Sequence, residues 1–244
     1  SEASHPDEHT NGTARLDPGQ RLNAGRTRSL RFDGAVSNTG FWGVPLRKGA
    51  SYRLQVWVKG IGTLKAGLGE SAAPVGRLGS EWVRIERVLR AQGDDPKGVL
   101  RFEVEGGEAW IGFASLKPLD TWGGQPIRRD LGDLIAGLRP AFFRFPGGCF
   151  VEGQDFERMW DWKASIGPRE ARPGKDWRFW GYACTDGLGF HEYLEWSERM
   201  GADALFVANC GMSHSQVAPM SQMGRFVQDA LDAIEYAIGP VDSK

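Results

Sequence analysis

The hydrophobic pattern of this chain changes its period near residue 120, and this change divides the sequence into two regions of different fold class. Before it, short segments with alternating apolar and polar residues are separated by glycine-rich turns. In "SYRLQVWV", for example, Leu54, Val56 and Val58 share one face, which is typical of a half-buried strand. Seven such segments predict a jelly-roll type of β-sandwich over residues 26–120. The polar lead-in, residues 1–25, is left unassigned.

Residues 121–244 instead alternate predicted helices with predicted strands. Apolar residues recur at helical spacing in three segments, which predicts helices over residues 125–139, 187–201 and 220–239. Short continuous apolar runs between them predict strands over residues 141–145 and 204–211. This order is typical of a parallel sheet wrapped by helices. A (β/α)8 barrel needs about 250 residues. The region therefore predicts an incomplete barrel that packs against further polypeptide.

Composition excludes several partners. Thirty basic and 31 acidic side chains are dispersed along the chain, which argues against nucleic acid as the main partner. No apolar run approaches the roughly 20 residues of a membrane span, and the polar start is not a signal peptide. The ten tryptophans suit either an ordinary core or sugar recognition. In the sandwich region these two alternatives stay open for Trp42, Trp57, Trp82 and Trp110.

The cysteines and histidines do not form a metal or redox motif. Cys149, Cys184 and Cys210 are widely spaced and lack the paired spacing of a zinc site, so free thiols are expected. His191 and His214 match no metal-binding or hydrolase motif. The carboxylates Glu152, Asp161, Glu170, Asp186 and Glu195 are expected to be solvated or paired with arginines.

The stretch "FFRFPGGCFVEG" marks a candidate site, because a buried strand ends there in a Pro-Gly-Gly turn. Arg144 lies within the strand. A buried guanidinium needs acceptors, so it predicts either a structural ion pair or an anionic site at the end of the strand. Asn209 ends the next strand, where an amide can bind sugar hydroxyls, orient a carboxylate or cap a helix.

Several longer motifs, in fixed order, resemble the α-L-arabinofuranosidases of glycoside hydrolase family 51. They are "DTWGGQPIRRDL", "LRPAFFRFPGGCFVEG", "WDWKASIGPREARPG", "FWGYACTDGLGFHEYLEW", "GADALFVANCGMSHS" and "FVQDALDAIEYAIGP". The upstream "SNTGFWGVPLRKGASYRLQVWVKG" is similar to the carbohydrate-binding module found in some members. The resemblance implies that residues 141–145 and 204–211 are the second and third strands of an interrupted barrel.

The same resemblance implies roles for individual residues. Cys149 would touch the arabinose ring and Arg144 would lie near the nucleophile carboxylate, while Gly148 would let the backbone approach the sugar. Trp180 would form one wall of the pocket, and packing beneath the loop is its alternative. Trp160, Trp162 and Trp177 are weaker candidates. The acid/base and nucleophile glutamates are expected beyond Lys244, so no catalytic residue is assigned within the chain.

The implied reaction is retaining hydrolysis of terminal α-L-arabinofuranosyl residues from arabinoxylan- or arabinan-type glycans, without a metal or other cofactor. The expected partners are an arabinose-containing oligo- or polysaccharide and the remainder of the same enzyme. Two alternatives stay open: a non-catalytic carbohydrate-binding protein, and an endoglucanase or xylosidase on the same barrel. A secreted or periplasmic location is favoured over the cytoplasm.

Overall fold

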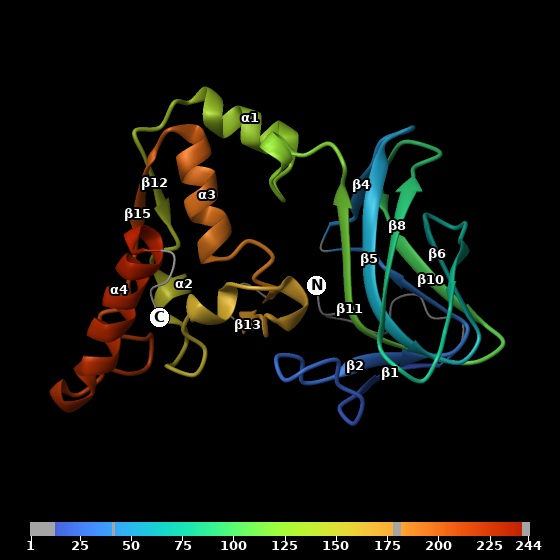
Figure 1. The fold of residues 1–244 in the computed structure, drawn as a ribbon, viewed down its shortest axis with the longest axis horizontal. Helices are drawn as coiled ribbons and strands as arrows, with labels where there is room; N and C mark the ends of the chain where they lie inside the picture. Colours follow the sequence, from blue (N-terminus) through green and yellow to red (C-terminus); the bar gives the residue numbers. More distant parts are fainter. Residues whose placement is uncertain (1–12, 41, 178–181, 241–244) are drawn as a thin grey trace. The chain divides into compact units, whose positions relative to one another are not determined.

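The computed structural model describes residues 13–40, 42–177 and 182–240, which are drawn in colour in Figure 1. The chain divides into two compact units. The first unit comprises Ser1–Arg128 together with Pro168–Pro173, and the second comprises Arg129–Gly167 together with Gly174–Lys244. The main boundary therefore lies eight residues after the predicted one at 120, and a short piece of the later sequence belongs to the first unit.

The first unit is built from antiparallel strands. Their bounds are β1 Ala14–Asp17, β2 Ser29–Phe32, β3 Ala35–Asn38, β4 Val44–Leu46, β5 Ser51–Gly60, β6 Thr63–Leu68, β7 Ala73–Arg77, β8 Val83–Arg90, β9 Asp95–Gly98, β10 Leu100–Glu105 and β11 Ala109–Pro118. One sheet has the order β1-β2-β11-β5-β8, a second has the order β3-β10-β6-β7, and β4 pairs with β9. A short 3-10 turn, Trp122–Gly124, follows the last strand.

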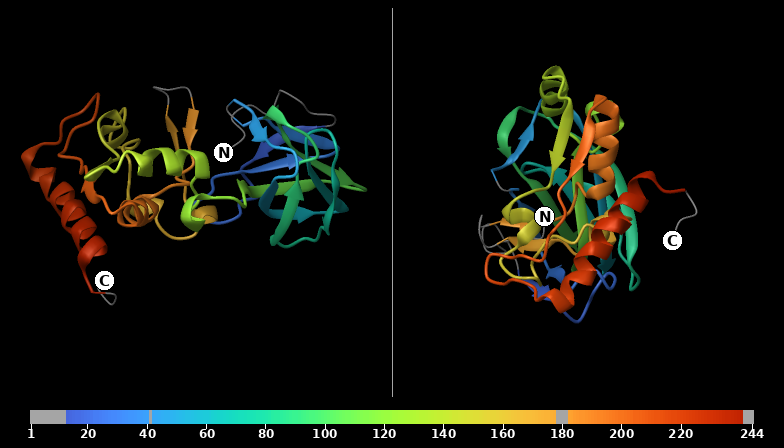
Figure 2. Two further views of the ribbon diagram at one scale, coloured as in Figure 1. Left: turned by 90° about the horizontal axis from the view of Figure 1, so that it is seen from above. Right: turned by 90° about the vertical axis from the view of Figure 1, so that its left-hand side faces the viewer.

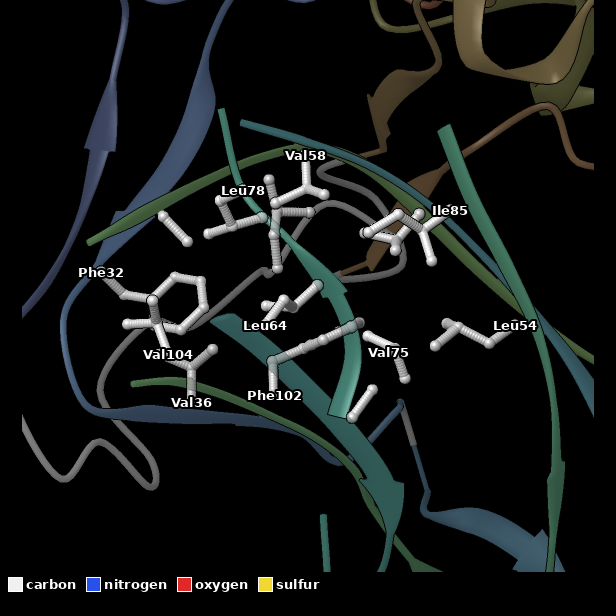
Figure 3. Close-up of a cluster of buried hydrophobic side chains, with 14 of the residues drawn as sticks. Phe32, Val36, Leu54, Val58, Leu64, Val75, Leu78, Ile85, Phe102 and Val104 are labelled. Carbon is white, nitrogen blue, oxygen red and sulfur yellow. The ribbon is translucent and has the colours of Figure 1, made fainter. Parts of the chain in front are cut away.

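The two larger sheets share one hydrophobic core (Figure 3). Leu54, Val56 and Val58 of β5 are fully buried, while Gln55 and Trp57 between them are partly exposed and Arg53 before them is exposed, so the predicted alternation along this strand is confirmed. Side chains from the other sheet meet them, among them Leu64 of β6 and Phe102 of β10. Burial of apolar area from both sheets is the main favourable term that holds this unit together.

The unassigned lead-in contributes a strand to this unit. Residues 14–17 form β1, which pairs with β2 at the edge of the five-stranded sheet. The Asp17 carboxylate accepts a hydrogen bond of 2.8 Å from the Trp110 indole N–H, and this bond lowers the pKa of Asp17. The sequence "ARLD" alternates apolar and polar residues over only four positions, a short signal on which no strand was predicted.

The segment 168–173 is held on the first unit by the loop between β1 and β2. The Arg26 guanidinium, which is only 6% exposed, donates to the backbone carbonyls of Glu170 and Arg169 at 3.1 and 3.0 Å. The Asn23 amide donates to the Glu170 carbonyl at 3.0 Å. Since a buried charged group must be hydrogen-bonded, these contacts give Arg26 acceptors that water would otherwise supply.

Gly25 provides a test of this docking. A Cβ at this position would lie 1.9 Å from the Ala171 carbonyl oxygen, which is backbone and has no rotamer to move away. We expect Gly25→Ala to release the segment and to accelerate tryptic cleavage after Arg169 by at least about tenfold, because proteolysis follows the population of the open form. The measurement is the appearance of the fragment that ends at Arg169. Gly93→Ala is the matched control, since its Cβ would meet nothing within 4 Å; equal cleavage of both variants would contradict the expectation.

The second unit contains the helices and two small sheets. Its elements are α1 Arg129–Gly137, β12 Phe142–Phe145, α2 Cys149–Glu152, the 3-10 turn Lys163–Ser165, β13 Lys175–Trp177, β14 Tyr182–Cys184, α3 Phe190–Met200, β15 Asp203–Phe206, the 3-10 turn Met220–Gln222 and α4 Met223–Ile238. The predicted order of helices and strands is confirmed. The hairpin β13–β14, seen as two orange arrows in the left view of Figure 2, interrupts the long predicted loop.

Strands β12 and β15 are parallel neighbours, and α3 packs on one of their faces (Figure 1). Phe145 of β12 and Phe190 of α3 are almost fully buried there, and their ring centroids are 6.1 Å apart. Helix α3 ends at Gly201, whose φ of 67° is the left-handed conformation typical of a glycine helix cap, as the sequence predicted. On the opposite face, Phe142 is 57% exposed and Leu205 is 47% exposed.

The apolar stripes of α1 and α4 are only partly buried among the described residues. On α4, Phe226 and Ala233 are buried, but three apolar side chains at helical spacing are more than half exposed: Val227, Leu231 and Ile234. On α1, Leu134 is 66% exposed. The predicted helical periodicity is therefore present, whereas burial of the whole stripe is not.

Candidate functional site

The parallel arrangement of β12 and β15 brings the loops that follow them to the same edge. Phe145 pairs with Phe206 at the carboxyl ends of the two strands, and the Val207 N–H donates to the Phe145 carbonyl at 2.9 Å. Residues 146–156 and 207–218 continue from these ends. The carboxyl edge of parallel strands is where barrel enzymes build their sites, so this edge is the candidate functional site.

Arg144 is exposed, which corrects the expectation of a buried guanidinium. Its side chain lies on the uncovered face of β12 and folds over the turn, where a Cβ on Gly147 would lie 2.5 Å from the Arg144 Nη1 atom. Gly147 has a φ of +107°, a conformation that other residues rarely adopt. Within the described residues no carboxylate lies within ion-pair distance of Arg144. The predicted structural ion pair is therefore absent from this part of the chain.

Gly148 and Cys149 lie at the surface of the same edge. Gly148 precedes α2 with a φ of +54°, and a Cβ there would meet nothing within 4 Å. Cys149 is an exposed free thiol at the first position of α2. The turn thus exposes the backbone of Gly148 next to the small side chain of Cys149. Whether they contact a sugar stays a prediction.

Asn209 follows β15, and all its hydrogen bonds in the structure go to the protein itself. Its Nδ2 donates to the carbonyls of Val151 at 3.1 Å and Met212 at 2.9 Å. Its Oδ1 accepts from the N–H groups of Gly211 at 2.7 Å and Met212 at 3.0 Å. An amide has two donor hydrogens and two acceptor lone pairs. The side chain is therefore fully used in forming a turn and joining two loops, and its predicted sugar contact stays a prediction.

An imidazole and a carboxylate at this edge come from the two loops. The His214 Nε2 atom lies 3.4 Å from the Glu152 Oε2 atom, with both side chains more than a third exposed. Sequence reasoning expected Glu152 to be solvated or paired with an arginine and gave His214 no partner. The pairing could not be read from the sequence, because 62 positions separate the two residues and only the parallel strands bring them together.

Asp186, one of the carboxylates expected to be solvated or paired with an arginine, is buried. It is 3% exposed, and its Oδ1 accepts hydrogen bonds from the Trp160 indole N–H at 3.2 Å and the Cys184 thiol at 3.3 Å. Lys175, directly opposite Cys184 in the hairpin, has its pKa lowered by burial, and the negative charges of Asp161 and Asp186 oppose this shift. The motif "CTDG" reads as a turn, and nothing in it signals burial.

The tryptophan candidates differ in their surroundings. Trp160 and Trp162 are 5% and 7% exposed and belong to the core beneath α3, which favours the packing role for both. Trp177 lies on β13, and Trp180 lies outside the described residues. A cavity of about 20 Å³ beside Asn209 is lined by Trp160, Val151 and Phe206 among others. It has room for about one water and not for a sugar ring.

Among the described residues no group of three or more His, Cys, Asp or Glu side chains could hold a metal ion. No helix in the same part of the chain is long and apolar enough to cross a membrane.

Comparison with known proteins identifies the family. Residues 134–244 match the family model described as "Alpha-L-arabinofuranosidase 1 domain". Alpha-L-arabinofuranosidase 1 of Arabidopsis thaliana is 35% identical over 221 residues, which cover 85% of this chain and 33% of the relative. The extracellular exo-alpha-L-arabinofuranosidase of Streptomyces chartreusis is 32% identical over 242 residues, covering 88% of this chain and 29% of the relative. The chain thus spans about a third of the length of these relatives.

The fold agrees with the sequence comparison. The structure of an arabinose-bound GH51 α-L-arabinofuranosidase superposes with a TM-score of 0.86 and 26% sequence identity. The match covers 96% of this chain and 43% of the solved one, so it includes both units. On this combined evidence the chain belongs to the α-L-arabinofuranosidases of glycoside hydrolase family 51.

Proposed function

We propose that the protein carrying this chain is a retaining α-L-arabinofuranosidase that releases terminal arabinofuranosyl residues from arabinoxylan- or arabinan-type glycans. The names of the Arabidopsis and Streptomyces relatives support the activity. In retaining hydrolysis one carboxylic acid protonates the leaving oxygen while a second carboxylate, about 5 Å away, attacks the anomeric carbon. We assign part of the sugar pocket to this chain and both glutamates to residues outside it.

The observation that carries this proposal is the two-sided character of the β12–β15 pair. One face is covered by α3, while the other exposes Phe142, Arg144 and Leu205. In a (β/α)8 barrel one face of each strand meets the helices and the other fills the interior. We therefore interpret residues 121–244 as an incomplete barrel whose exposed strand face is the barrel interior, and the first unit as a β-sandwich joined to it.

The residues at the carboxyl edge then take specific roles. Gly148 and Cys149 contact the arabinose ring through the bare backbone and the thiol. Arg144 lies beside the nucleophile carboxylate and keeps it ionised, since an opposite charge nearby lowers a carboxyl pKa. Trp180 forms a wall of the pocket. The exposure of Arg144 and Cys149 at one edge supports this assignment.

We assign a supporting role to the first unit rather than glycan binding. Trp110 donates to Asp17 and lies under the Arg31 guanidinium, and Trp82 donates to the Arg21 carbonyl. A charged group lies over one face of each of these two rings, Arg31 over Trp110 and Lys59 over Trp82, which leaves less ring surface for a sugar to stack on. Trp42, 83% exposed, is the tryptophan to replace in a test of this assignment. We further propose export from the cytoplasm, supported by the extracellular Streptomyces relative.

The decisive experiment is hydrolysis of an aryl α-L-arabinofuranoside by the full protein that carries this chain, with the anomer of the first product followed by NMR. We expect release of arabinose with retained configuration, and no turnover by residues 1–244 alone. Matched aryl β-xyloside and cello-oligosaccharide substrates serve as controls. Turnover of these in place of the arabinofuranoside would overturn the proposal in favour of a xylosidase or endoglucanase, and turnover by the 244-residue chain would refute the placement of the glutamates.

A further inference from the structure

The loops that follow β12 and β15 are joined along their length by side-chain and backbone contacts, which we call the loop seam. Its members link residues 151–156 to residues 209–216. They are Asn209 Nδ2 to the Val151 carbonyl at 3.1 Å, the His214 N–H to the Gly153 carbonyl at 3.0 Å, Ser215 Oγ to the Gln154 carbonyl at 2.8 Å, the Phe156 N–H to Gln216 Oε1 at 3.0 Å, and the contact of His214 Nε2 with Glu152 Oε2 at 3.4 Å.

The seam acts on the turn that presents Cys149. Helix α2 consists of four residues, Cys149–Glu152, between two glycines with positive φ. A single helical turn has too few hydrogen bonds to be stable alone. Two of its residues are held from the other loop, Val151 by Asn209 and Glu152 by His214. The position of Cys149 therefore depends on residues 60 and 65 positions further along the chain.

Asn209 is the seam residue with the most contacts to lose. Four of its hydrogen bonds are to backbone groups, and three of these shape its own loop while one reaches α2. No donor or acceptor of this amide is left for a sugar hydroxyl. A side chain in this state influences a ligand through the groups that it holds in place.

We propose that Asn209 is a positioning residue that fixes the α2 turn, and with it Cys149, at the rim of the sugar pocket. The inference rests on the proposed function only in that Cys149 is taken to touch the sugar. Gln216 takes part in the same positioning from the far end of the seam. A direct sugar ligand at residue 209 is the competing role, and the two roles predict different behaviour of the free protein.

Backbone hydrogen exchange of the 244-residue chain distinguishes them. In Asn209→Ala we expect the amides of Val151, Gly153 and His214 to exchange about tenfold faster than in the wild type, without any sugar present. Asn209→Asp should behave in the same way, because a carboxylate faces the carbonyl oxygens of Val151 and Met212 without donors. Met220→Ala, in the 3-10 turn just after this loop, is the matched control, since its side chain is 85% exposed. Wild-type exchange in both Asn209 variants would overturn the proposal.

Kinetics of the full protein provide the second measurement, with Gln216→Ala as the variant that leaves Asn209 intact. Positioning predicts that Asn209→Ala and Gln216→Ala both raise KM for the aryl arabinofuranoside, Asn209→Ala by about tenfold, while kcat falls less than threefold. A rise in KM for Asn209→Ala alone, with exchange unchanged, would identify a direct sugar ligand instead. Faster exchange in a protein that does not hydrolyse the arabinofuranoside would support the loop seam and refute the proposed function.

Discussion

Replacing Phe32 by alanine is expected to lower the free energy of unfolding of the first unit by about 3–5 kcal/mol. The Phe32 ring is 1% exposed and lies in the core shared by both large sheets (Figure 3). Its removal loses the transfer free energy of the ring and leaves a cavity that a sheet-on-sheet core closes only in part. The measurement is urea unfolding followed by tryptophan fluorescence, with the midpoint moving and the slope unchanged.

Val88→Ala is the control for this experiment, because Val88 lies on β8 of the same sheet and is 58% exposed. Its loss of stability should stay within about 0.5 kcal/mol. An equal loss in the two variants would mean that the two sheets do not share a packed core around Phe32.

Replacing Cys149 by tryptophan in the full protein is expected to reduce kcat/KM for an aryl α-L-arabinofuranoside at least about a hundredfold, which corresponds to about 2.7 kcal/mol of transition-state stabilisation. The exposed thiol lies at the start of α2, directly after the bare Gly148 backbone. An indole there would occupy the volume that we assign to the arabinose ring. Steady-state kinetics across a range of substrate concentrations is the measurement.

Cys149→Ser is the size-matched control for the tryptophan variant. It keeps the volume and the hydrogen-bonding ability of the thiol, so its kcat/KM should stay within about tenfold of the wild type. Both variants should unfold at the wild-type temperature, since the side chain is exposed. Activity of the tryptophan variant within threefold of the wild type would show that residue 149 is not in the pocket.

Hydrophobic periodicity predicted the elements of this chain better than their burial. The alternation in β5 and the helical spacing in α4 both correspond to observed elements. The predicted burial was wrong for Leu134 of α1 and Leu231 of α4, which are exposed. Periodicity indicates which side chains share a face, but not whether another segment covers that face. Strand β1 was missed although "ARLD" alternates apolar and polar residues, because a run of four is a weak signal and the place of the strand depends on pairing with β2 and on the Asp17–Trp110 hydrogen bond.

For the candidate site, sequence reasoning placed residues relative to the end of a strand but did not predict their contacts. The Pro-Gly-Gly turn correctly indicated an edge at which Arg144, Gly148 and Cys149 lie near the end of a strand. It did not predict that Arg144 is exposed or that the amide of Asn209 is saturated by backbone groups. Both facts depend on how two loops, distant in sequence, meet in three dimensions. A single sequence carries no signal for such a meeting.

Because residues 168–173 pack on the first unit, that unit is not one continuous segment of the chain. The chain crosses between the two units at 128/129, 167/168 and 173/174, so a cut after residue 120 or 128 does not release a self-contained domain. It would remove the carbonyls that satisfy the buried guanidinium of Arg26 and the backbone that closes over Gly25. To produce this unit on its own, residues 168–173 must therefore be fused to it, or Arg26 must be replaced by a polar residue whose side chain can be hydrated.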